Sequence, residues 1–264
     1  MRIAKDGLVL REVAYGENDK LLTVLTADEG KIFLTAKGAR SSRSKVGALC
    51  RLFCYANIEY YEKNGRRWLS GGSVNNSFYD ISSDLEGMAL AAYVAEVADE
   101  ITGEGVEAED ILRMTLNTLY AIEKKLRPYE QIKAVYELSA VYFSGLYPDL
   151  SGCAVCHRTE MGDMWLDVMN GRLVCEECQH SRSARLGGAE VDAYETRNIL
   201  VPIDSSALAA MRYVLSSPIQ RVFSFSLEGE SLKRFSKAAE TYLLNHLERD
   251  FDTLHFYRSV ISEQ

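Results

Sequence analysis

The sequence predicts an α+β protein of several domains, with a five-stranded β-barrel first and then a helical domain interrupted by a cysteine-containing segment. Short apolar stretches with a two-residue period occupy roughly the first 70 residues, and a period of about 3.6 follows Ser77. Two Cys-x2-Cys pairs, 18 residues apart, interrupt the helical pattern. We therefore expect a barrel at 1–80, helices at 81–150 and 183–264, and the cysteine segment at 151–182.

Length and composition exclude several classes of protein. The chain has 264 residues, of which 47% are hydrophobic and 26% are charged, which excludes a disordered chain. No apolar run approaches the roughly 20 residues that a membrane-spanning helix needs. We expect a soluble, cytoplasmic protein without a membrane partner.

Five segments have the pattern of strands: 8–15, 20–26, 31–37, 52–62 and 67–71. The first three are separated by Gly- and Asp-containing clusters that favour chain reversal. Asn64-Gly65 lies between the last two and is typical of a type I′ hairpin turn. Five short strands of this spacing suit a small closed barrel of the OB type, and an open sheet fits the same periodicity.

Charge is distributed unevenly along the chain. The net charge is −8, but residues 31–67 contain nine basic and two acidic residues, which gives this segment +7 and leaves −15 for the other 227. An acidic protein does not attract nucleic acid as a whole, whereas a local basic segment can.

The loop between the third and fourth strands holds four cations, Lys37, Arg40, Arg43 and Lys45, among glycine and serine residues and without a carboxylate. Such groups contact phosphate oxygens, so we expect this loop, with Arg66 and Arg67 at the hairpin, to bind a nucleic-acid backbone. The alternative is a solvated loop. Neighbouring aromatic residues could stack on unpaired bases, although strand alternation should bury most of them: Phe53, Tyr55, Tyr60, Tyr61 and Trp68.

The remaining periodic segments predict helices. Asp84 is a candidate N-cap for a helix ending near Ile101, and Pro128 begins a helix that ends near Leu146. Further helices are expected at 107–125, 189–199, 205–215 with Ser205 as cap, and 227–251, all in one core. Glu130, Glu137 and Asp149 have no catalytic partner at helical spacing, so we interpret them as solvated or structural acids.

Cys153, Cys156, Cys175 and Cys178 form a candidate metal site. Two Cys-x2-Cys pairs can surround one Zn²⁺ tetrahedrally while the spacer folds back as a hairpin, and four thiolates leave no position for water or substrate. We therefore expect one structural zinc ion per chain and no catalytic metal. Two disulfides are the competing interpretation, but no signal peptide is apparent and Cys50 and Cys54 are unpaired in the pattern, which favours a reducing compartment. His157 and His180 stand beside the pairs as bystanders.

The combination of a strand meander containing Gly16-Glu17, Thr26 and Ala36-Lys-Gly-Ala-Arg40, a helical body, and a Cys-x2-Cys pair after residues 145–150 resembles the RecO family of bacterial DNA repair proteins. The resemblance spans nearly the whole chain. It implies an OB-fold that binds single- and double-stranded DNA, annealing of complementary strands, and a nucleoid-associated location. It also implies that the protein acts with RecR, and in many bacteria with RecF, to help RecA displace single-stranded-DNA-binding protein. The C-terminal tail of single-stranded-DNA-binding protein is a further implied partner.

Two other functions compete with a non-enzymatic DNA-binding mediator. One is a zinc-stabilised adaptor whose helices bind proteins and whose basic loop is incidental, which binding of an oligonucleotide by the barrel would exclude. The other is a metal-dependent nuclease, which needs clustered carboxylates or histidines, whereas the chain has only four histidines.

Overall fold

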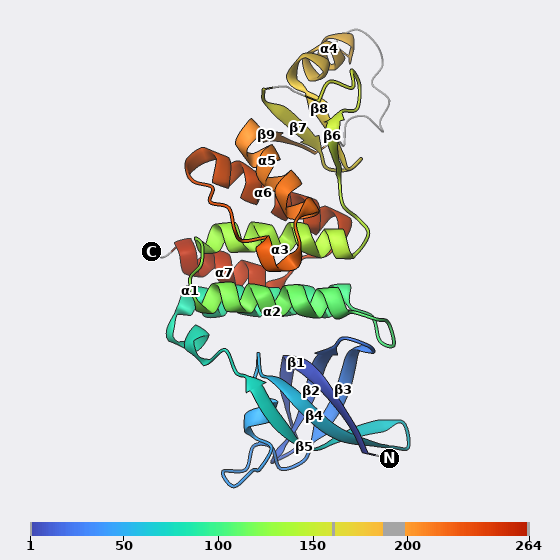
Figure 1. Ribbon diagram of the computed structural model, residues 1–264, viewed down its shortest axis with the longest axis vertical. Coiled ribbons are helices and arrows are strands. Elements are labelled where there is room, and N and C mark those ends of the chain that lie inside the picture. The colour runs from blue at the N-terminus through green and yellow to red at the C-terminus, as the bar shows by residue number, and fades with distance from the viewer. Residues whose placement is uncertain (1, 160–161, 187–198, 263–264) are drawn as a thin grey trace. The chain divides into compact units, whose positions relative to one another are not determined.

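The computed structural model describes residues 2–159, 162–186 and 199–262 (Figure 1). The chain folds into two compact units. The first contains Met1–Lys125 together with Phe251–Gln264, and the second contains Leu126–Asp250. Among the described residues, no helix is both long enough and apolar enough to cross a bilayer.

The first unit begins with a closed five-stranded barrel, which confirms the predicted barrel and excludes the open sheet. The strands follow the order β1-β2-β3-β5-β4, and β4 pairs with β1 to close the barrel. All pairs are antiparallel except β3 with β5, as an OB-fold requires. The bounds are β1 Arg2–Tyr15, β2 Asp19–Thr26, β3 Gly30–Ala36, β4 Tyr55–Lys63 and β5 Arg66–Asn76.

Three strand bounds differ from the sequence expectation. β1 begins at Arg2 rather than at residue 8, and residues 2–8 pair with β4. Residues 52–54 turn before β4 begins, and Phe53 has a φ of 64°. β5 continues beyond residue 71 to Asn76, where a loop was expected. At Gly72 a Cβ atom would lie 2.2 Å from the carbonyl oxygen of Asn57, so the glycine permits close strand pairing here.

Backbone hydrogen bonds join the β2–β3 turn to the loop that follows α1 (Leu85–Ile101). The Lys31 N–H donates to the Gly103 carbonyl at 3.1 Å, and the Gly105 N–H donates to the Glu29 carbonyl at 2.8 Å. Gly30 lies between them with a φ of 63°, and a Cβ atom there would be 2.2 Å from the Gly103 oxygen. The barrel is therefore fixed to the helices of its own unit.

Three helices complete the first unit: α1, α2 (Glu109–Glu123) and α7 (Asp252–Ser262), preceded by the 3₁₀ helix η2 (Tyr79–Ser83). The expected cap of α1 is confirmed, because the Asp84 carboxylate accepts hydrogen bonds from the N–H groups of Glu86 and Gly87. α7 packs along α1, where the rings of Phe251 and Tyr93 meet edge to face with centroids 5.7 Å apart.

The second unit contains α3 (Tyr129–Phe143), α5 (Ser205–Ser216) and α6 (Gly229–His246). α3 lies before the cysteine segment in the chain, and α5 and α6 lie after that segment. α3 packs against both α5 and α6, which confirms this part of the expected helical core. α1 and α2 belong instead to the first unit. The cap of α5 is Asp204 rather than Ser205, since the Asp204 side chain accepts from the Ala207 N–H at 2.8 Å.

The single helix expected over 227–251 is wrong. α6 ends at His246 and α7 begins at Asp252. Glu248 has a φ of 49°, a left-handed conformation that ends helices and usually falls on glycine. No glycine marks this break in the sequence.

The cysteine segment forms a four-stranded sheet and a helix. Its strands, in the order β6-β8-β7-β9, are β6 (Asp149–Cys153), β7 (Met164–Asp167), β8 (Arg172–Cys175) and β9 (Leu200–Ile203), and α4 (Glu176–Leu186) follows β8. The antiparallel pair β7–β8 is the expected hairpin. β9 is a strand that the sequence pattern did not predict. The helix expected at 189–199 falls almost entirely on 187–198, outside the described residues.

Candidate nucleic-acid interface and metal centre

The basic loop after β3 is held against the β1–β2 turn. The Gly38 N–H donates to the Asp19 carboxylate at 2.8 Å, and the Arg40 N–H donates to the Asn18 carbonyl at 2.9 Å. Ala39 and Leu49 are buried, and residues 48–50 form the 3₁₀ helix η1 (Ala48–Cys50). The backbone of the loop is therefore packed onto the barrel at these points.

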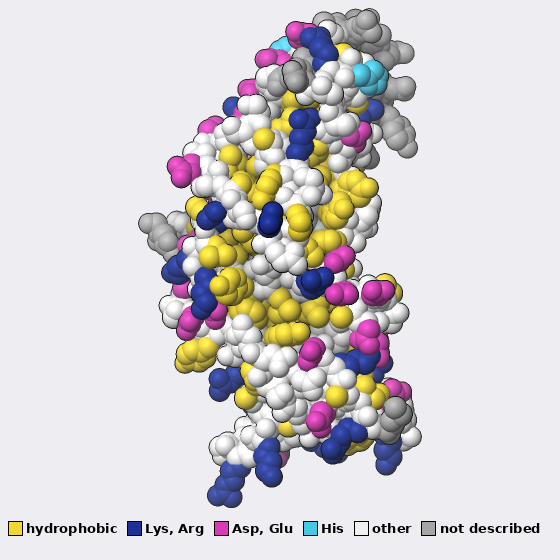
Figure 2. All heavy atoms as spheres, in the orientation of Figure 1, with side chains coloured by type: hydrophobic (Ala, Val, Ile, Leu, Met, Phe, Trp, Pro, Cys, Tyr) yellow, Lys and Arg dark blue, Asp and Glu magenta, His cyan; other side chains and the backbone are white. Residues whose placement is uncertain are grey.

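The six cations predicted to contact phosphate do not form one cluster. Arg43 and Lys45 are exposed on the loop, and the Arg40 guanidinium is also exposed while donating to the Glu17 carbonyl at 3.1 Å. Lys37, Arg66 and Arg67 lie in a separate groove on the side of the barrel. Figure 2 shows Lys and Arg side chains along the lower edge of the barrel. Figure 1, which has the same orientation, shows the loop after β3 at this end of the barrel.

The barrel groove has a volume of about 810 Å³ and crosses β1, β2, β3 and β5. In an OB-fold this face, around strands 2 and 3 with the first and last hairpin loops, binds oligonucleotides. Its charged side chains are Arg11, Lys37, Arg66, Arg67, Asp19, Glu62 and Glu104, and its apolar and aromatic side chains include Val13, Tyr15, Leu21, Phe33 and Trp68.

Strand register places the groove residues in rows across the barrel. Val13 pairs with Leu21, Leu21 with Thr35, and Thr35 with Trp68, so one row crosses four strands. Arg11 pairs with Thr23 and Thr23 with Phe33 in the next row. Because side chains alternate along a strand, these residues face outward while their neighbours fill the barrel core.

Large apolar side chains on this outward face were missed in the sequence analysis. Val13 is 42% exposed, Leu21 40% and Phe33 48%. An exposed apolar row beside cations is the surface that unpaired bases and phosphates need together. The signal was available, since Leu21 and Phe33 occupy positions of opposite alternation to the core residues Leu22 and Leu34.

Carboxylates limit the positive charge of the groove. Arg67 is half-buried and pairs with Glu29 at 3.1 Å and Glu62 at 3.8 Å. Asp19 accepts from the Gly38 N–H, as described above. Arg11, Lys37 and Arg66 remain exposed and have greater freedom than Arg67 to meet a phosphate.

A second hollow, the loop crevice, has a volume of about 510 Å³ at the base of the basic loop. Its cations are Lys20, Arg40 and Arg51, and serine hydroxyls from Ser41, Ser42 and Ser44 lie among them. Lys20 is paired with Glu12. The crevice has no aromatic lining, so its chemistry suits phosphate oxygens rather than bases.

Of the five aromatic residues considered from the sequence, Phe53 and Tyr60 are buried, so the expectation that most of the five lie in the core is wrong. Tyr55 is half-buried, while Tyr61 is exposed and Trp68 is half-exposed in the barrel groove.

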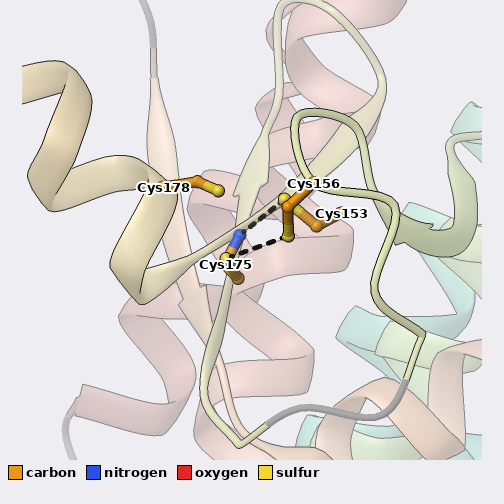
Figure 3. Close-up of side chains that lie close together, drawn as sticks. All are labelled: Cys153, Cys156, Cys175 and Cys178. Atoms are coloured by element: carbon orange, nitrogen blue, oxygen red, sulfur yellow. Dashed lines mark hydrogen bonds between the residues drawn. The ribbon is translucent and has the colours of Figure 1, made fainter.

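The four cysteines converge on one point in the second unit (Figure 3). Cys153 ends β6, Cys156 follows in the next turn, Cys175 ends β8, and Cys178 lies in the first turn of α4. Their sulfur atoms all lie within 4.8 Å of one another, and those of Cys156 and Cys175 are 3.7 Å apart. A tetrahedral site with metal–sulfur bonds of about 2.3 Å has sulfurs about 3.8 Å apart, so the cluster can hold a metal ion.

The surroundings of the four thiols shift their pKa values in different directions. Burial opposes ionisation of Cys153, but N–H groups of residues 156, 175 and 155 outweigh it and lower the pKa of this thiol to about 6. A hydrogen bond with the Cys175 thiol, and then burial, raises the pKa of Cys178 to about 12. A bound cation would remove this inequality, because a metal ion deprotonates the thiols that coordinate it.

Charged residues surround the cluster without entering it. Arg158 hydrogen-bonds Cys156 and pairs with Glu177, and both interactions raise the pKa of its guanidinium. His157 and His180 are exposed and, within the residues that the structure describes, neither belongs to the group of possible ligands.

Comparison with known proteins covers both units. The model for "Recombination protein O N terminal" matches residues 1–78, and that for "Recombination protein O C terminal" matches residues 82–255. The DNA repair protein RecO of Acetivibrio thermocellus is 28% identical over 254 residues, 96% of this chain and 95% of that protein. The RecO proteins of Caldicellulosiruptor saccharolyticus and Alkaliphilus metalliredigens are 25% and 24% identical, over 98% of this chain and 98% and 100% of theirs.

Proposed function

The chain belongs to the RecO family, whose members act in DNA repair and recombination, and on that premise we propose that it is a DNA-binding mediator of recombinational repair. It binds single- and double-stranded DNA, anneals complementary strands, and with RecR and RecF helps to load RecA onto DNA covered by single-stranded-DNA-binding protein. It acts by binding rather than by catalysis, with the nucleoid in the cytoplasm as its place of action.

The barrel groove is the observation that carries this proposal. It combines exposed cations with a row of outward apolar side chains on the face that OB-folds use for oligonucleotides. Groove cations neutralise phosphates while the apolar row receives bases, so the barrel can bind DNA without reading its sequence.

The basic loop extends the proposed DNA surface. Arg40 lines the loop crevice, and Arg43 and Lys45 are exposed beside it. Phosphate contacts of this kind neither require unpaired bases nor distinguish sequences. Arg67 contributes less than the sequence suggested, because Glu29 and Glu62 already pair with it.

For the metal centre we propose one structural Zn²⁺ per chain. A closed set of four thiolates fits zinc and leaves no coordination position for a substrate. When bound, the ion supplies a cross-link rather than a reactive group. Cys153 and Cys156 tie the end of β6 to Cys175 and Cys178 at the junction of β8 and α4.

Protein partners follow from family membership. RecR, RecF, RecA and the C-terminal tail of single-stranded-DNA-binding protein are the proposed partners. A zinc-stabilised adaptor without DNA contact is the second candidate, favoured by the acidic charge outside residues 31–67.

The test is DNA binding by the full chain with groove cations removed. We expect Arg11→Ala with Arg66→Ala to weaken binding to an oligonucleotide at least about tenfold at low salt, since two phosphate contacts are lost. Arg113→Ala is the matched control, because Arg113 is exposed on α2 and pairs only with Glu109 at 3.4 Å among the ion pairs of the described residues. No binding by wild type would favour the adaptor, whereas equal affinity for wild type and double variant would mean that DNA binds outside the groove.

A further inference from the structure

Trp68 lines two neighbouring hollows on the surface of the barrel. It ends the row of side chains that begins at Val13, and it pairs with Tyr61 of β4 on its other side. Besides the barrel groove it lines a hairpin hollow of about 500 Å³, with Lys37, Tyr61, Lys63, Asn64 and Arg66. The indole therefore lies where two solvent-open hollows meet, within reach of a chain that passes from one to the other.

A cation covers the indole ring. The Lys37 ammonium lies 4.5 Å from the ring centroid, inside the range of a cation–π contact. Lys37 is itself exposed, so a ligand can reach the ring face that the ammonium covers. Unlike Arg67, Lys37 has no carboxylate within ion-pair distance among the described residues.

We propose that Trp68 is a stacking platform for an unpaired base and that Lys37 covers the ring until a nucleotide displaces it. The base takes the place of the ammonium on the ring, and the ammonium moves to a phosphate of the same strand. Lys63 and Arg66 border the hairpin hollow and receive the next phosphate. This inference rests on the proposed DNA binding and names Trp68 as the residue that makes the groove favour single strands over duplex.

The platform separates single strands from duplex. In a duplex each base is already stacked on its neighbours, and exposing one costs unstacking and unpairing energy. Phosphates are equally accessible in both forms, so the basic loop contacts either. Trp68 should therefore contribute to single-strand affinity and hardly at all to duplex affinity.

The experiment uses the full chain with Trp165→Phe. The chain has two tryptophans, so this substitution leaves Trp68 as the single source of indole fluorescence. An oligothymidylate and a duplex of equal length are titrated at fixed salt while indole fluorescence and anisotropy of the labelled DNA are followed. We expect the single strand to quench Trp68. Trp68→Leu should weaken single-strand binding by about 5- to 150-fold, the effect of losing one stacked base, and change duplex binding by less than about twofold.

Three further variants complete the test. Trp68→Phe keeps a smaller ring and should restore part of the affinity, which separates stacking from folding. Tyr79→Leu removes an aromatic side chain that is 69% exposed and lines neither hollow, so it should change nothing. Lys37→Met should flatten the log–log salt slope by about 0.7, one phosphate contact on a single strand, and retain the quenching.

The outcomes distinguish the two proposals. Normal oligonucleotide binding without quenching, or equal losses for single strand and duplex in Trp68→Leu, would overturn the platform and leave the DNA-binding function in place. Failure of wild type to bind any oligonucleotide at low salt would overturn both.

Discussion

Lys133 and Glu137, one turn apart on α3, form an ion pair of 2.8 Å with both side chains buried. Glu240 of α6 lies 2.8 Å from the same ammonium on its other side. The sequence analysis interpreted Glu137 as a solvated or structural acid. Because it is buried and paired with Lys133, we interpret it as structural. The pairs connect two helices within the second unit.

Removing the ammonium should destabilise this unit strongly. Lys133→Met removes the ammonium that pairs with both carboxylates, one of them fully buried, and breaking a buried pair in this way costs about 3–5 kcal/mol. Lys233→Met, on the exposed face of α6, should stay within about 0.5 kcal/mol of wild type. Urea unfolding measures both, and equal stabilities would show that the pairs contribute nothing.

The same cluster predicts a dependence on high pH. Burial alone would lower the pKa of Lys133, but Glu137 and Glu240 outweigh it and raise the pKa above its ordinary 10.5. The contribution of Lys133 to stability is therefore complete below pH 10.5, begins to fall above it, and is lost as pH rises through the folded-state value. The stability difference between wild type and Lys133→Met should shrink above pH 10.5. A difference that grows there would contradict the raised pKa.

Cys175→Ser should abolish metal binding and disorganise residues 150–182 without affecting a chemical step. Structural zinc sites contribute folding energy directly, so losing one ligand releases the ion and loosens the segment. Elemental analysis of protein purified without chelator should give one zinc per wild-type chain. Cys54→Ala, in the barrel, should retain the zinc. Wild type without zinc, or a Cys175→Ser variant of unchanged stability, would refute the structural site.

Arg40→Ala with Arg43→Ala should reduce the salt dependence of DNA binding. If about four cations each neutralise one phosphate, the wild-type slope on single strands is near −3, from about −0.7 per contact. The double variant should flatten this slope by about 1.4 and weaken two unrelated oligonucleotides alike, because phosphate contacts carry no sequence information. An unchanged slope would mean that the loop is merely solvated and that the groove alone binds DNA.

Gly30→Ala should destabilise the first unit more than Gly16→Ala. Both glycines have a φ near 60°, but an added Cβ at Gly30 would lie 2.2 Å from the Gly103 oxygen, whereas at Gly16 it would meet nothing within 4 Å. Gly16→Ala should cost only the backbone strain of about 1–2 kcal/mol. Gly30→Ala should exceed that, because the α1–α2 loop has to move. Thermal unfolding compares the two, and equal losses would show that the loop yields easily.

Local signals in the sequence predicted much of this structure. Asn64 and Gly65 adopt positive φ at the hairpin tip, the Asp84 side chain caps α1, and the cysteine spacing brings four sulfurs together. Each of these features depends on residues that are close in sequence, or on a spacing that has few structural solutions. Residue type and spacing alone were enough to predict them.

Features that depend on distant partners were not predictable in the same way. β9 exists because Leu200–Ile203 pairs with β7, and β5 extends to Asn76 because Gly72 lets β4 approach. α6 ends where Glu248 adopts a conformation that its residue type does not favour. The barrel groove needed the register of four strands, since only the pairing of Val13, Leu21, Thr35 and Trp68 makes them one row.

The position of α7 has a consequence for synthesis of the chain. The first unit includes residues 251–264, so a ribosome must add the 125 residues from 126 to 250 after α2 before it adds the segment that covers α1. At about 5–20 residues per second this takes roughly 6 to 25 seconds. During that interval the ring contact between Tyr93 and Phe251 and the hydrogen bond between Thr253 and the Glu96 carboxylate cannot form. In a nascent chain α1 therefore lacks the contacts that residues 251–262 supply, and a stop codon near position 250 would make that loss permanent.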